Sequence, residues 1–290
     1  MDKVFIVAHK SDGQTNTVKR GVKFAKKLNK QAEVFGYSYE PLPNFDDYVP
    51  AVTPLNQNAI LEKDKKRIEE ILERMGAEDV PVHSLWNKYL YEHVAKISVE
   101  QQFSMIIKGV HNSDRLTPTD WHLMRHTRVP VLFLNDNEEF KSDNILLALD
   151  LSSKSSLKQA LNQKIIHVGK NLAKACGLTL HIAHVVRMPT LVNDLDLINN
   201  QMRIDKAKHR LLPQLQEIGI AESEFHVAAG DPEICLYQLS CALQAKYLVL
   251  GARQRKGFFG YVIGNTAEAI LSKIQSNIVV VPVEVEDAET

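Results

Sequence analysis

The chain has 290 residues, of which 44% are hydrophobic and 24% are charged, and this is enough apolar material for two cores of roughly 140 residues each. Lysine plus arginine and aspartate plus glutamate both number 35, so no excess positive charge indicates a nucleic-acid partner or an acidic membrane surface. The apolar run behind Met1 spans only about five residues, too few for a signal peptide or a membrane span. We therefore expect a cytoplasmic protein that binds neither nucleic acid nor membrane.

Three cysteines, Cys176, Cys235 and Cys241, lie far apart and have no CxxC spacing. An odd number without ligand spacing argues against a disulfide framework and against a thiolate metal site. Free cysteine behaves as a small hydrophobic residue. We therefore expect all three to be ordinary core residues.

Two copies of one pattern follow each other along the chain. An apolar strand at residues 3–11 and another at 144–152 align without a gap, and each precedes an apolar stripe at helical spacing. The stripe residues are Val18, Val22, Ala25 and Leu28 in the first copy and Leu161, Ile165, Val168 and Leu172 in the second. Further strands follow in the same order, at 31–40, 80–86, 103–109 and 129–135, and at 178–186, 224–230, 246–251 and 277–283.

Strands that are apolar on both faces and alternate with amphipathic helices indicate a parallel sheet covered by helices on both sides. We predict an α/β protein with two tandem doubly wound parallel-sheet domains, residues 1–138 and 143–290. The join falls in the polar segment 135–144. Each copy carries a long irregular insertion after its second strand, at 41–58 and 187–200, and such loops are usually functional or mobile.

Several short motifs lie at the predicted strand ends. They are LALD at 147–150, HVV at 184–186, GDP at 230–232, VLGARQ at 249–254 and GNTAE at 264–268. Together they resemble the universal stress proteins over nearly the whole chain, and TPTDWHLMR at 117–125 resembles the tandem, E-type members more narrowly. The resemblance implies the adenine nucleotide alpha hydrolase-like fold and a role in bacterial stress survival. It also implies ATP, with Mg²⁺, as the candidate cofactor, because many members bind it.

The ATP signature of that family is glycine, two residues, glycine, nine residues, and glycine with serine or threonine. Here Gly251 and Gly264 keep the correct separation, whereas Gln254 and Asn265 replace the second glycine and the hydroxyl residue. Gln254 disfavours a left-handed backbone and could hold the phosphate loop open. Asn265 tolerates that geometry and can donate to phosphate.

The resemblance also assigns roles in the second domain. It places Asp150 on the ribose or adenine side and the backbone of Val185 at the adenine edge. The residues around the phosphates are Gly251, Arg253, Gly264, Asn265 and Thr266. In the first domain, His9 replaces the aspartate and the segment after Gly109 is five residues shorter, so we expect no nucleotide there.

A structural alternative stays open for the same residues. Asp150 could cap its turn with Ser152 and Ser153, while Gly251 ends a strand and Gly264 starts a helix. A similar alternative applies to His122 and His126, which lie four apart near Asp120 and could share a metal ion. No third ligand is evident, so we favour exposed helix histidines and predict no metal site.

The sequence contains no GxSxG, GxxxxGK[ST] or HExxH motif. We therefore expect a non-catalytic stress-response sensor or scaffold that binds ATP or another phosphorylated ligand and unidentified protein partners. A weak ATPase, relying on positioning and electrostatics, and a nucleotide-independent interaction module are the alternatives. In the family, domains associate through their last strands. Residues 131–135 and 278–283 could pair in this way within one chain, as an internal pseudo-dimer that functions as a monomer or a homodimer.

Overall fold

The computed structural model describes residues 3–8, 16–39, 54–110, 117–135, 142–187, 196–257, 260–262 and 276–284. At 54–55, 196–200, 253–257, 260–262 and 284 only the backbone is described. The chain divides into two compact units, one on either side of the polar segment that follows Leu134. Each unit is described below by itself.

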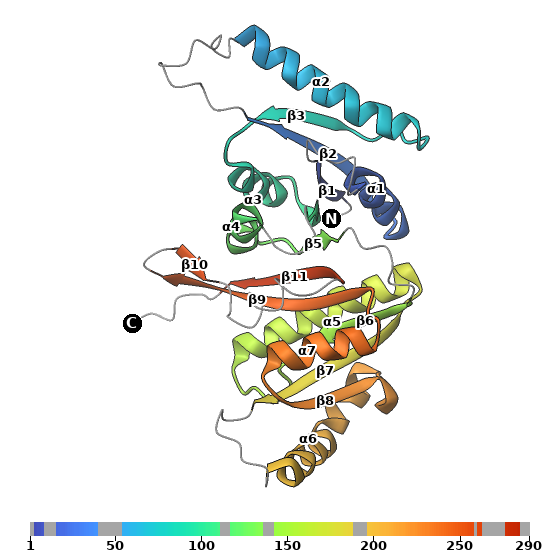
Figure 1. Ribbon diagram of the computed structural model, residues 1–290, viewed down its shortest axis with the longest axis vertical. Helices are drawn as coiled ribbons and strands as arrows, with labels where there is room; N and C mark the ends of the chain where they lie inside the picture. Colours follow the sequence, from blue (N-terminus) through green and yellow to red (C-terminus); the bar gives the residue numbers. More distant parts are fainter. Residues whose placement is uncertain are drawn as a thin grey trace. The chain divides into compact units, whose positions relative to one another are not determined.

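The first unit is a parallel sheet with the strand order β3-β2-β1-β4-β5 (Figure 1). Its strands are β1 (Lys3–Ala8), β2 (Gln31–Ser38), β3 (Val82–Trp86), β4 (Phe103–Gly109) and β5 (Val131–Leu134). Its helices are α1 (Thr17–Lys27), α2 (Pro54–Glu73), α3 (Leu90–Glu100) and α4 (Pro118–His126). Helix α2 begins inside the segment that we expected to be irregular, with Ile68 and Leu72 fully buried on the sheet.

The second unit repeats this order as β8-β7-β6-β9-β11, with the short β10 antiparallel to β9. Its strands are β6 (Asn144–Ala148), β7 (Thr179–Arg187), β8 (Phe225–Gly230), β9 (Tyr247–Gly257), β10 (Gly260–Val262) and β11 (Asn277–Glu284). Its helices are α5 (Ser156–Cys176), α6 (Asp196–Ile218), the 3₁₀ turn η1 (Glu222–Glu224) and α7 (Pro232–Ala242). Right-handed crossovers place α5 and α6 on one face and α7 on the other.

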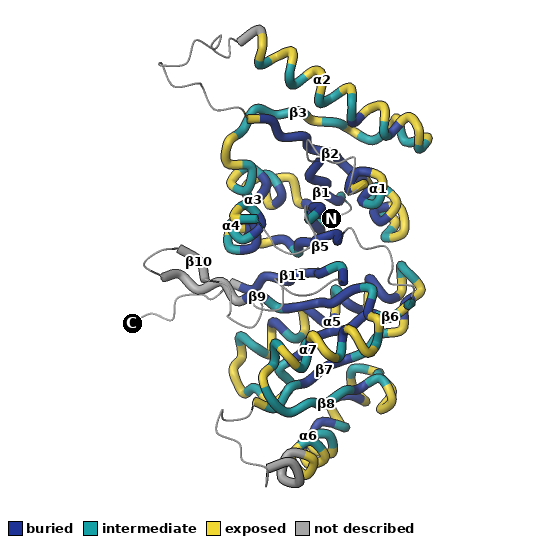
Figure 2. Tube along the Cα trace, viewed as in Figure 1, coloured by how far each residue is buried: buried dark blue, intermediate teal, exposed yellow. Residues whose placement is uncertain are grey.

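Burial follows the pattern that the sequence predicts for such sheets. The central strands β1, β4, β5 and β6 are mostly buried and the outer strands β3 and β8 are mostly half-buried, whereas the helices alternate between buried and exposed positions (Figure 2). In the first unit the core is aromatic, because Phe5 stacks on Phe35 at 3.9 Å and meets the edge of Phe103 at 5.1 Å between ring centroids. The predicted α/β class with doubly wound parallel sheets is confirmed.

In each unit the first helix crosses the first strand at a glycine. An ideal Cβ on Gly21 would lie 3.0 Å from Ile6, and one on Gly169 would lie 2.6 Å from Leu147. Close approach of helix and strand explains both glycines. It also corrects the expected stripes, because Val22 and Val168 are only partly buried while Gly21 and Gly169 are buried.

The cysteine prediction is wrong, because Cys176 and Cys235 are half-buried and Cys241 is exposed on α7. Asp231 caps α7, because its Oδ1 accepts from the backbone N–H of Glu233 at 2.9 Å. Among the described residues, no helix is both long and apolar enough to cross a lipid bilayer.

A chain of hydrogen bonds crosses the amino ends of β6, β7 and β8. Asn144 Nδ2 donates to the Leu243 carbonyl at 2.8 Å, so Asn144 Oδ1 faces His181 Nε2, 3.3 Å away, as an acceptor. His181 Nε2 therefore carries the proton, and His181 Nδ1 accepts from His226 Nε2 at 3.1 Å. Protons on both rings would set two N–H groups against each other, so these hydrogen bonds require at least one of the two imidazoles to be neutral.

We expect acid to destabilise the second unit through this chain. Burial lowers the pKa of His181 against the opposing charge of Glu224, and burial, His181 and Lys208 lower the pKa of His226. Both pKa values thus lie below that of the unfolded chain, about 6.5. The stabilisation is present above that pH and is lost as the pH falls.

Denaturant unfolding between about pH 7 and pH 5 measures this loss directly. The variant His226→Gln keeps a donor at the same place but does not titrate, so its unfolding free energy should fall less on acidification. A matched variant, His209→Gln, changes an exposed histidine of α6 and should behave as the wild type. If the unfolding free energy of all three proteins depends equally on pH, these hydrogen bonds are not an acid-sensitive element.

Candidate ligand-binding site

The carboxyl ends of β6 and β9 flank a topological switch point. From β6 the chain proceeds to β7 on one side, and it later returns to β9 on the other side. The ladder between β6 and β9 ends at the pair Leu147 and Val249, whereas β9 continues along β11 as far as Gln254. The two strands therefore part just before Asp150 and Gly251, and in open α/β sheets ligands bind at such a place.

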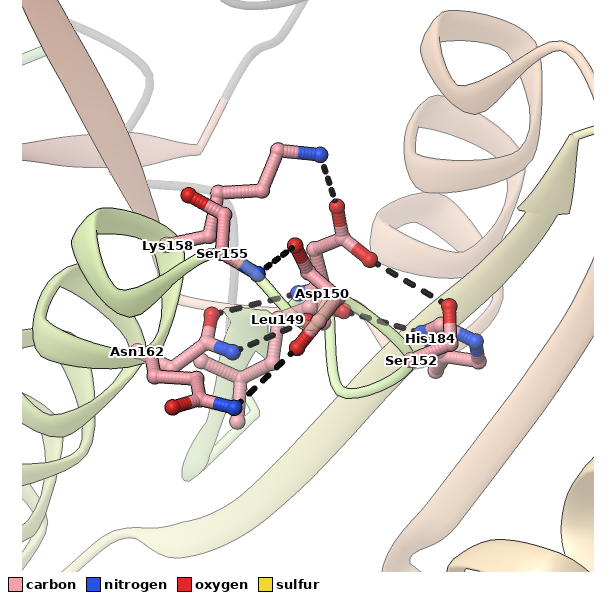
Figure 3. A network of polar contacts seen from close by, with 9 residues as sticks. Leu149, Asp150, Ser152, Ser155, Lys158, Asn162 and His184 are labelled. Atoms are coloured by element: carbon pink, nitrogen blue, oxygen red, sulfur yellow. Dashed lines mark hydrogen bonds and ion pairs between the residues drawn. The ribbon is translucent and has the colours of Figure 1, made fainter.

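Asp150 stands at this point, at the end of β6, within a polar network (Figure 3). Its Oδ2 lies 2.5 Å from Lys158 Nζ on α5, and its Oδ1 accepts from Ser152 Oγ at 3.4 Å. The carboxylate side chain is 45% exposed and that of Lys158 is 32% exposed. Asp150 is thus held in a fixed position and remains accessible to solvent.

The backbone of Asp150 is fixed by a second residue of α5. Asn162 Oδ1 accepts from the Asp150 N–H at 3.2 Å, and Asn162 Nδ2 donates to the Asp150 carbonyl at 2.9 Å (Figure 3). Lys158 and Asn162 are four residues apart and so share one face of the helix. One helix face therefore positions both the main chain and the carboxylate of Asp150.

The next strand contributes a buried histidine. Burial lowers the pKa of His184, which is 2% exposed, so its imidazole is neutral. His184 Nδ1 donates to the Leu149 carbonyl at 3.1 Å and fixes the turn that leads to Asp150. Its Nε2 is a buried acceptor without a partner in the described part of the chain, and such an atom calls for an explanation.

Val185 lies two residues past the end of the β6 ladder. On one side it pairs with Ala228 of β8, whereas on the other side β7 pairs with β6 only as far as Ala183, whose carbonyl accepts from Leu149 N–H. The edge of Val185 that faces the switch point is thus beyond the last rung between β6 and β7. This is where the resemblance places the adenine edge.

Gly251 has a packing role. An ideal Cβ at this position would lie 2.6 Å from Leu161 Cδ2 of α5, which is closer than side chains normally approach. Helix α5 therefore packs closely on β9 at the strand residue Gly251, and on β6 through its own residue Gly169. Gly251 thus has a structural role, but not the one that the sequence suggested, because β9 does not end at Gly251 and continues to Gly257.

The segment after Gly251 corrects one expectation. Arg253 and Gln254 do not begin a loop but continue β9, opposite Val283 and Glu284 of β11, and the chain then forms a hairpin with β10. Gln254 thus has an extended backbone and not the left-handed one that would have made it an obstacle. The side chain of Arg253 and all of His9, Gly264, Asn265 and Thr266 lie outside the described residues.

Three site residues were not identified from the sequence. Lys158 and Asn162 carry a weak signal, the i, i+4 spacing of two polar residues beside the apolar stripe of α5. His184 is part of the HVV motif, but nothing in the sequence shows which of its nitrogens is engaged. All three depend on how α5 and β7 pack around the end of β6.

In the first unit a buried ion pair occupies the corresponding strand end. Lys108 of β4 places Nζ 2.7 Å from Asp120 Oδ1, as an ion pair without hydrogen-bond alignment, and the side chains are 4% and 0% exposed. Asp120 Oδ2 also accepts from the N–H and the hydroxyl of Thr117, both at 2.7 Å, and so caps α4. In the second unit, the residue before the matching glycine is the buried, apolar Leu250.

The two histidines of α4 form an aromatic cluster. His122 stacks on Tyr91 at 4.6 Å, and His126 lies 5.5 Å from the same ring. His126 Nδ1 is 2.7 Å from the His122 carbonyl, and Asp120 is buried against Lys108. Within the described ranges no group of three histidine, cysteine or acidic residues could hold a metal ion.

Comparison with known proteins agrees with this architecture. Residues 141–282 match the model of the universal stress protein family. Universal stress protein E of Escherichia coli K12 is 28% identical over 229 residues, which is 72% of each chain, and the homologue in Haemophilus influenzae is 24% identical over 233 residues. The two alignments cover 72% and 76% of this chain.

Solved structures show the same fold. A universal stress protein from Pseudomonas aeruginosa UCBPP-PA14 superimposes with a TM-score of 0.72 at 20% identity, over 97% of this chain and 93% of that one. One from Archaeoglobus fulgidus gives 0.60 at 16% identity. The fold defines an α/β protein built of two doubly wound parallel-sheet units in tandem. Residues 141–282 belong to the universal stress protein family, and the chain is similar to universal stress protein E over 72% of its length, which supports a stress-response role.

Proposed function

We propose that the second unit binds an adenine nucleotide at the carboxyl edge between β6 and β9, and that the protein acts as a non-catalytic sensor or scaffold in the stress response. One observation carries the proposal. Beyond Leu147 and Val249 the two strands part, and Asp150, held by Lys158 and Asn162, stands at the opening. This is the place at which doubly wound folds bind nucleotides.

Three features support an adenine nucleotide there. The free edge of Val185 offers backbone groups to a base. Nε2 of His184, next to Val185, is a buried acceptor that has no partner among the residues that the structure describes. Lys158 adds a cation beside the carboxylate. Mg²⁺ would arrive with the phosphates, because the carboxylate of Asp150 is already paired.

The same pairing gives Asp150 a binding role. Its Oδ2 accepts from Lys158 at 2.5 Å, so the carboxylate serves as an anchor for ligand and helix. We propose that ligand binding biases a surface that recognises protein partners.

Calorimetry with ATP and Mg²⁺ tests the proposal. We expect micromolar binding by the wild type, loss of binding in Gly264→Trp, whose side chain would fill the proposed phosphate position, and binding at least about tenfold weaker in Asp150→Ala. We expect no turnover of the bound ATP. The matched control is Asp231→Ala, which removes an exposed aspartate that caps α7 outside the opening.

The outcomes separate the three functional classes. If ATP binding is retained in Asp231→Ala and lost in Gly264→Trp, the result supports the proposed function as a nucleotide sensor. Turnover that disappears in Asp150→Ala would instead indicate an ATPase. If no heat of binding is detected at ATP concentrations up to millimolar, the second unit acts through protein partners without a nucleotide.

A further inference from the structure

The ammonium group of Lys158 is positioned but only partly used. Lysine has three N–H donors, and within the described residues its partner is Asp150 Oδ2, at 2.5 Å. The side chain is 32% exposed. At least one donor therefore faces solvent at the point where β6 and β9 part.

The position of this ammonium is set by Asp150 and, through Asp150, by Asn162 of α5. Asn162, one turn further along the helix, clamps the backbone of Asp150 by two hydrogen bonds. Because the backbone and the carboxylate of Asp150 are both held, Lys158 cannot follow a ligand far from this place without giving up its ion pair. It is thus a fixed cation at the mouth of the site.

The ion pair also changes the charge of the opening. A lone Asp150 carboxylate would repel a phosphate, and it would attract the hydroxyl groups of a neutral nucleoside. With Lys158 beside it, the pair is neutral in sum and directs a cationic donor outward. Charge-assisted N–H···O bonds from ammonium to phosphate are stronger than those between neutral groups.

We propose that Lys158 is the specificity-determining residue of this site and selects phosphorylated ligands over their neutral nucleosides. The inference rests on the proposed function, because it concerns the same opening. Lys158 holds a ligand phosphate with a donor that Asp150 does not use, while Asp150 keeps the ammonium in place. In this arrangement the carboxylate acts on the phosphate through the lysine and is a positioning residue for it.

The test compares ATP and adenosine as calorimetric probes on the full chain. We expect Lys158→Met to weaken ATP binding at least about tenfold, the value of one lost charge-assisted contact, and to leave adenosine binding within about threefold. Lys158→Arg keeps the cation and should retain most ATP affinity. Lys154→Met is the matched control, since it removes an exposed lysine that lies just before α5.

A second readout separates selection from a merely structural role. The ATP affinity of the wild type should fall with added salt more steeply than that of Lys158→Met, because one screened contact is missing in the variant. Equal loss of ATP and adenosine binding would show that Lys158 only supports the turn, and unchanged ATP binding would show that it does not touch phosphate. Either result overturns the inference while nucleotide binding itself stands. A wild type that binds neither probe overturns the proposed function and the inference together.

Discussion

Replacing Lys108 by methionine is expected to destabilise the first unit by about 3–5 kcal/mol, the usual cost of breaking a buried ion pair from one side. The side chain of Lys108 is 4% exposed and that of Asp120 is not exposed at all, so water cannot take over the lost contact. The remaining donors from Thr117 compensate only part of the charge. Denaturant unfolding, followed by the fluorescence of Trp86 and Trp121, measures the loss.

A surface lysine of the same unit provides the control. Lys96 pairs with Glu100 at 3.9 Å and is 70% exposed, so Lys96→Met should change stability by less than about 0.5 kcal/mol. The double variant Lys108→Met with Asp120→Asn should be more stable than the sum of its single changes implies, because neither residue is then left as an unpaired charge. Additive losses, or a small loss in Lys108→Met, would show that the pair contributes little.

Replacing Gly251 by alanine is expected to cost about 1–3 kcal/mol through overpacking. The new Cβ would lie 2.6 Å from Leu161 Cδ2, so the leucine or the whole of α5 must move. The cost arises without any ligand. It can therefore be measured by thermal or denaturant unfolding of the unliganded protein.

A second substitution shows whether the contact is the cause. Leu161→Ala alone should cost about 2–5 kcal/mol, and combined with Gly251→Ala it should cost less than the sum, because alanine at 251 fills part of the space. Gly169→Ala, whose Cβ meets Leu147 at 2.6 Å, is the matched control and should gain nothing from Leu161→Ala. The same rescue at both glycines would contradict a specific contact.

The architecture could be predicted because its signals are local and repeated. Buried runs such as 144–148 and 246–251, each followed or preceded by an amphipathic helix, leave few arrangements other than a doubly wound parallel sheet. The match between the two copies then gave the order of the elements. The errors were the start of α2, which lies inside a segment expected to be irregular, and details of burial at positions such as Val22 and Cys241. The burial errors arose because a glycine can face the strand in a close helix contact and a cysteine can lie at the surface.

The site was predicted less completely, for a physical reason. Asp150 and Val185 were located from motifs at strand ends, and the structure places them beside the same opening. The hydrogen bonds that Lys158 and Asn162 make to Asp150 depend on the distance between α5 and β6, which spacing along one helix does not reveal. The continuation of β9 through Gln254 depends on pairing with β11, far along the chain, and so contradicts a loop that local residues suggested.

The clamp of Asn162 on Asp150 has a consequence for how a ligand is received. The side-chain amide of Asn162 makes two hydrogen bonds to the backbone of Asp150, as a neighbouring strand would. The end of β6 is therefore ordered without a ligand. A site built in advance in this way loses little conformational freedom on binding. For the nucleotide binding that we propose, the turn that carries Asp150 would therefore be ordered before the ligand arrives, and binding would not require this turn to fold.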